Sequence, residues 1–148
     1  MKLKIAVLTV WGIVAAIAAG RAGSLALAAQ AQKTPWDGIY TDAQAKRGDA
    51  VYADKCASCH GPEMGGKDDA PALVGAEFTN NWLELSVAAM YERIRTSMPQ
   101  TSPGSLTRPE VADVIAAILK KGKYPAGAAE LPPNTDILGD YKFVEKKP

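Results

Sequence analysis

The stretch Cys56-Ala57-Ser58-Cys59-His60 contains both cysteines and the single histidine of the 148-residue chain. A Cys-x-x-Cys-His run is the attachment signal for c-type haem. Two thiols three positions apart lie on one helical turn, where each can form a thioether to a haem vinyl group. The next residue, His60, is then held beneath the iron and supplies an imidazole nitrogen as the proximal ligand. The stretch therefore predicts one covalently attached haem c per chain.

Other uses of these residues fit the sequence poorly. A structural zinc site needs about four ligands, and the chain has no further Cys or His to supply a fourth. A redox Cys-x-x-Cys of the thioredoxin kind is expected near a βαβ pattern, and no such pattern precedes Cys56. A disulfide across two intervening residues would be strained and would leave His60 without a role.

Residues 1–29 have the layout of a secretory signal peptide. Lys2 and Lys4 form a basic start, an apolar run follows from Ile5 to Gly20, and small residues end the segment around Ala29. The apolar run is short for a membrane span, which needs roughly 20 residues. We therefore expect export to the periplasm, where c-type haem is attached. An uncleaved N-terminal anchor, which would place the protein at the membrane, is the alternative.

The charge balance excludes one class of partner. The whole chain has a net charge of +1, and removal of the three basic residues in 1–29 leaves 14 basic and 16 acidic residues. There is no basic stripe with interleaved aromatic residues, so nucleic acid is not an expected partner. The residues after 29 form a small domain, which has little apolar surface with which to build a stable core by itself. A buried haem would be the largest apolar object in that core.

Capping signals and apolar spacing predict an all-α domain over residues 41–122, with about three to five helices around the haem. Thr41 with Gln44 and Thr107 with Glu110 have the spacing of capping boxes. The predicted helices are 41–55, a short turn within 78–85, 87–96 and 107–121. Residues 30–40 are predicted to be an extended lead-in, 61–75 and 99–106 to be loops, and 123–148 to be an irregular tail that either follows the surface or frays.

The second iron ligand is predicted from the methionines. No second histidine exists, so a bis-histidine haem is excluded. Met64 is too near His60 to reach the opposite face, and Met90 has the helical spacing of a packing residue. Met98 ends a helix before Pro99, where no packing stripe includes it. We expect Met98 to be the distal ligand, which would favour ferrous iron and raise the reduction potential.

With these features placed, residues 41–122 resemble a class I c-type cytochrome of the single-haem bacterial kind. The resemblance implies a cytochrome c-like fold in which Gly48 permits a close crossing of the helix at 108–121. It also implies that the Pro71 carbonyl accepts a hydrogen bond from His60 and fixes its orientation. One departure is that Ala117 and Ile118 occupy a region where the family often carries an aromatic residue.

A narrower similarity concerns 91–99, 103–106 and 124–127. These stretches look like haem modules that serve periplasmic quinoprotein dehydrogenases. The resemblance implies redox protein partners, with a periplasmic dehydrogenase as donor and an oxidase or another cytochrome of the respiratory chain as acceptor. Near the haem, Arg93 or Arg95 is expected to pair with a propionate, and Trp82 is expected to donate its indole N–H there. A solvated helix end is the alternative for both arginines.

The sequence is compatible with three functions. An iron with two protein ligands has no open position for a substrate, which favours a one-electron carrier and not an enzyme. If Met98 were not bound, an open site could serve a haem enzyme or a gas-binding cytochrome, although no distal histidine is present to act as acid or base. A permanently docked cytochrome subunit of a dehydrogenase complex would share the carrier's chemistry.

Overall fold

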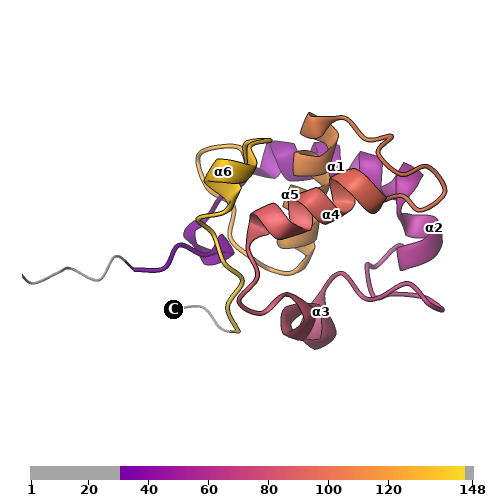
Figure 1. Ribbon diagram of the computed structural model, residues 1–148, viewed down its shortest axis with the longest axis horizontal. Helices are drawn as coiled ribbons and strands as arrows, with labels where there is room; N and C mark the ends of the chain where they lie inside the picture. The colour runs from indigo at the N-terminus through magenta and orange to yellow at the C-terminus, as the bar shows by residue number, and fades with distance from the viewer. Residues whose placement is uncertain (1–30, 146–148) are drawn as a thin grey trace, which may run out of the picture. The chain divides into compact units, whose positions relative to one another are not determined.

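The computed structural model describes residues 31–145, and these fold as an all-α domain, as the sequence predicted (Figure 1). Within this range, β-pairing is limited to three isolated bridges. Four helices have eight or more residues, and a 3₁₀ turn and two single-turn helices complete the set. In chain order the elements are η1 Pro35–Asp37, α1 Asp42–Lys55, α2 Ala57–His60, α3 Gly75–Trp82, α4 Val87–Ser97, α5 Arg108–Lys121 and α6 Thr135–Leu138.

Helix α5 is the centre of the core. It packs against α1 and α4, and α3 lies to one side of these three helices (Figure 1). All nine residues of α5 from Val111 to Leu119 are buried. The predicted capping box is present, because Thr107 accepts from the Glu110 N–H and Glu110 accepts from the Thr107 N–H. The C-cap of the helix is Gly122. The next residue, Lys123, has a left-handed backbone conformation, with φ of 67°, and turns the chain away from the helix.

Helices α1 and α5 cross at Gly48. A β-carbon at Gly48 would lie 1.8 Å from the backbone carbonyl oxygen of Asp113 and 3.0 Å from the β-carbon of Ala117. The two backbones can approach this closely only because position 48 has no side chain. The small side chain of Ala117 faces the same crossing, which explains why no aromatic residue is found there.

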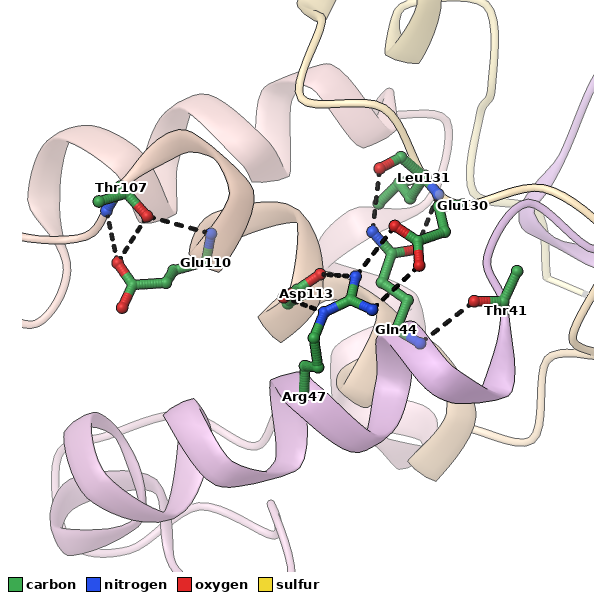
Figure 2. Close-up of polar contacts among 8 residues, drawn as sticks. All are labelled: Thr41, Gln44, Arg47, Thr107, Glu110, Asp113, Glu130 and Leu131. Atoms are coloured by element: carbon green, nitrogen blue, oxygen red, sulfur yellow. Dashed lines mark hydrogen bonds and ion pairs between the residues drawn. The ribbon is translucent and has the colours of Figure 1, made fainter.

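The start of α1 differs in one respect from the prediction. The Thr41 hydroxyl accepts a hydrogen bond from the Gln44 N–H, as expected of a cap. The Gln44 side chain does not complete the predicted capping box. It is buried, donates to the Leu131 carbonyl oxygen at 3.0 Å and accepts from the Leu131 N–H at 2.7 Å (Figure 2). The N–H and carbonyl of Leu131 are buried and would be costly to leave without partners, whereas water can satisfy the N–H groups at the start of a helix. The Gln44 side chain therefore bonds to Leu131.

Residues 123–145 pack along the domain, and they are not wholly irregular as predicted, because α6 forms over Thr135–Leu138 behind an Asn134 cap. Leu131, Leu138 and Phe143 are each buried. Close to Leu131, the Arg47 guanidinium bridges two carboxylates (Figure 2). It donates to both oxygens of Asp113 on α5 at 2.9 Å and to both oxygens of Glu130 in the tail at 3.0 and 2.9 Å. This geometry ties α1, α5 and the tail together at one point.

The predicted signal peptide at residues 1–29 lies outside the residues that the structure describes. Within residues 31–145, no helix is long and apolar enough to cross a membrane.

The crossing at Gly48 leads to a stability prediction. Gly48→Ala places a methyl group against the Asp113 carbonyl, so α1 and α5 must separate. We expect the free energy of unfolding to fall by about 1–3 kcal/mol or more, the usual cost of overpacking. Gly65→Ala is the matched control, because a β-carbon there meets no atom within 4 Å. Urea unfolding of both variants with haem bound measures the difference, and equal midpoints would contradict the close crossing.

Candidate haem site

A cavity of about 1000 Å³ opens beside α2, at the upper end of the volume range of small-molecule and cofactor sites. Its walls come from every helix except α6 and from both long loops. They include Cys56, Cys59, His60, Pro71, Leu73, Phe78, Trp82, Leu85, Met90, Arg93, Ile94, Met98, Val114 and Ile118. The apolar side chains are the majority, and the lining also includes polar and charged ones: Lys55, Ser58, Lys67, Asp68, Asp69, Asn81, Gln100 and Thr101. This composition suits a flat apolar cofactor with a polar edge.

Cys56 and His60 are brought to the cavity by the junction between α1 and α2. Cys56 is the C-cap of α1, and its carbonyl oxygen accepts hydrogen bonds from the N–H groups of Cys59 and His60 at 3.1 and 3.0 Å. The junction and the single turn of α2 thereby present the three residues of the attachment motif, Cys56, Cys59 and His60, to one cavity. Burial, with a smaller contribution from Cys59, raises the pKa of the Cys56 thiol to about 11. The thiol is therefore neutral at physiological pH, because an ionised thiolate would be costly in these apolar surroundings.

The orientation of His60 is fixed by a backbone carbonyl. Its Nδ1 atom lies 2.9 Å from the Pro71 carbonyl oxygen. A carbonyl oxygen can only accept, so Nδ1 carries the proton and the Nε2 lone pair stays free. Histidines that bind metals commonly have this outer hydrogen bond, which holds the ring and increases the basicity of the ligand nitrogen. The contact that the family resemblance implied for Pro71 is thus present.

The loop after His60 is folded so that Pro71 can reach the histidine. Gly66 has φ of 81°, and a β-carbon there would lie 2.8 Å from the Ala72 nitrogen. The Leu73 N–H donates to the Met64 carbonyl oxygen at 2.8 Å, which closes the loop upon itself. Gly66 therefore allows a close approach within the loop's own backbone, whereas the preceding residue, Gly65, has open space around it.

Tyr52 holds the start of this loop from α1. Its hydroxyl donates to the Gly61 carbonyl oxygen at 2.6 Å, and the side chain is buried. Burial, and to a smaller extent the nearby Cys56, raises the pKa of Tyr52 to about 12. The hydroxyl consequently remains a donor over the whole physiological pH range.

Two methionines line the cavity, and they differ in their positions. Met98 is the C-cap of α4 and is partly exposed, while Met90 is buried inside the same helix. Met64 is buried as well, but it does not line the cavity. The structure thus leaves Met98 and Met90 as the thioethers that face this space among the described residues.

The two arginines of α4 are placed differently. Arg93 lines the cavity, and it has no ion-pair partner among residues 31–145. Arg95 does not line the cavity, and its guanidinium pairs with Glu92 at 2.7 Å. This difference follows from the helix geometry, because residues two apart on a helix point in different directions. Of the two arginines expected near a propionate, Arg93 is the one that lines the cavity.

Trp82 lines the cavity together with a residue that the sequence analysis did not single out. Phe78 stands four positions before Trp82 on α3, and both side chains face the same space. That spacing was a usable signal, because residues four apart share one face of a helix. Val114 and Ile118 of α5 line the cavity in the same way. Their apolar helical spacing indicates a buried face but does not distinguish a core from a cofactor wall.

Comparisons with known proteins agree with this arrangement. The family model described as cytochrome c oxidase, cbb3-type, subunit III matches residues 43–118. Among solved structures, the chain is similar to the sulfane dehydrogenase SoxCD from Paracoccus pantotrophus, with a TM-score of 0.50 and 25% identity over 59% of this chain and 51% of that one. It thus spans about half the length of that structure's chain. A comparison with curated proteins found no match. Because the family model covers just over half of the sequence, the chain belongs to this family of c-type cytochromes.

Proposed function

We propose that the protein is a periplasmic one-electron carrier with a single haem c, covalently attached through Cys56 and Cys59. The observation that carries this proposal is the meeting of both cysteines, the oriented His60 and Met98 at one largely apolar cavity. When bound, haem would supply a one-electron iron couple whose potential depends on its axial ligands and on burial. The protein's own residues hold the cofactor, keep water away and present its edge to partners.

His60 and Met98 are the proposed axial ligands. His60 is suited to this role because the Pro71 carbonyl leaves its Nε2 lone pair free. Met98 is suited because it stands at the end of α4, where the helix stops and the side chain lines the cavity. With both positions filled, no site would remain for a substrate, which supports a carrier over a haem enzyme or a gas-binding cytochrome.

The donor is proposed to be a periplasmic dehydrogenase, and the acceptor an oxidase or another cytochrome of a respiratory chain. The similarity to a sulfane dehydrogenase structure supports a donor of the dehydrogenase class. The same similarity favours a second candidate, a cytochrome subunit that stays docked to its dehydrogenase. The two candidates share the haem chemistry and differ in whether the contact is permanent. Residues 1–29 are proposed to be the export signal, or an anchor if they are retained.

The ligand assignment predicts a specific spectral change. Met98→Ala should abolish the far-red ferric absorption band that marks an iron–methionine sulfur bond, and it should lower the reduction potential because a thioether favours ferrous iron. Met90→Leu should keep the band, since this methionine is expected to pack and not to ligate. Visible spectra of the oxidised proteins measure both variants.

Two outcomes would contradict this assignment. Loss of the band in Met90→Leu and not in Met98→Ala would make Met90 the ligand. A wild-type protein that lacks the band and binds carbon monoxide readily would have an open site, and the enzyme or gas-binding alternative would then replace the carrier.

The position of Arg93 predicts a second change in the reduction potential. A cation at the cavity wall offsets the propionate charge and disfavours the extra positive charge of ferric haem. Arg93→Gln should therefore lower the potential. Arg95→Gln removes the same charge from the same helix, but Arg95 does not line the cavity, so the potential should move less. Redox titration compares the two variants, and an equal or larger shift for Arg95→Gln would refute the role of Arg93.

A further inference from the structure

The last part of the chain is attached to a wall of the cavity. The family match ends at residue 118, so this segment lies outside the matched residues. The Glu84 N–H donates to the Phe143 carbonyl oxygen, and the Phe143 N–H donates to the Leu85 carbonyl oxygen, both at 3.0 Å. The Val87 N–H donates to the Tyr141 carbonyl oxygen at 2.9 Å. These bonds fix the connection between α3 and α4, which carries Leu85 into the cavity lining.

The side chain of Phe143 stands directly behind the same wall. It is fully buried, and it packs edge-on against Phe78 with ring centroids 5.7 Å apart. Its ring centroid is 6.1 Å from that of Trp82. Phe78 and Trp82 line the cavity, whereas Phe143 does not. Phe143 therefore supports three cavity-lining residues, two through its ring and Leu85 through its backbone.

The support extends backwards along the tail to α1. The Phe143 ring lies 6.3 Å from that of Tyr124, whose carbonyl oxygen accepts from the Tyr40 hydroxyl at 2.7 Å. The two hydrogen bonds between Gln44 and Leu131 hold the middle of the tail. Phe143 is thus the fixed end of an anchored segment, so its ring cannot move away from Phe78 and Trp82 without disturbing these contacts.

We propose that Phe143 is a positioning residue of the haem pocket, which raises the reduction potential by keeping the wall of Phe78 and Trp82 closed to water. This inference rests on the proposed haem-carrying function. Ferric haem bears one more positive charge than ferrous haem, and water stabilises that charge better than an apolar wall does. A wall that loosens admits water and favours the ferric state, which lowers the potential.

The test uses the full chain with haem attached. Phe143→Leu keeps an apolar side chain and removes the ring that supports Phe78 and Trp82. Val111→Ala is the control, because Val111 is fully buried on α5 and lies outside the cavity lining. Each protein is titrated for its midpoint potential and unfolded in urea. We expect Phe143→Leu to lower the potential, whereas Val111→Ala should lose stability with its potential unchanged.

A purely structural Phe143 would give a different result. If Phe143→Leu loses stability as Val111→Ala does while its potential stays at the wild-type value, the inference is overturned. If Phe143→Leu does not fold, Phe143→Met, which can refill the space with a flexible chain, is read by the same criterion. A wild-type protein without covalent haem would instead overturn the proposed function, and this inference with it, before any variant is compared.

Discussion

The close crossing of α1 and α5 at Gly48 is the constraint on which the rest of the structure depends. The absence of a side chain there lets the Asp113 carbonyl sit where a β-carbon would otherwise lie. This contact sets the position of α1, whose C-terminal end carries Cys56 and the α2 turn. It also sets the face of α5 from which Val114 and Ile118 line the cavity. The two halves of the candidate site are therefore positioned by one backbone-to-backbone approach.

Around this crossing, the site is completed by polar contacts to backbone groups. The Pro71 carbonyl orients His60, and the Tyr52 hydroxyl holds the Gly61 carbonyl at the start of the same loop. Gln44 does the same for Leu131 in the tail. The bonds to Gly61 and Leu131 are buried, so each satisfies main-chain groups that would be costly to leave without a partner. All of these bonds fix a connecting segment of the chain in place.

Local signals in the sequence were sufficient for α1, α4 and α5 and for the haem-attachment stretch, but not for α6 or for the start of α3 at Gly75. The Thr107–Glu110 box spans four residues, and Cys56 to His60 spans five, so their geometry is set by near neighbours. Contacts between distant residues left no such signal. The partner of Gln44 is 87 positions away, and Phe143 meets Phe78 and Trp82 only after the tail has folded back. Arg93 and Arg95 could not be separated without knowing that the face of Met90 borders the cavity.

The claim at the centre of this account is that the cavity beside α2 holds one covalently attached haem. The most direct test is the intact mass of the protein, expressed with haem maturation and then denatured, beside a Cys56→Ala/Cys59→Ala variant. The account predicts that the wild-type chain retains the mass and absorbance of one haem after denaturation and that the variant retains none. A wild-type chain whose mass is that of the polypeptide alone would contradict it.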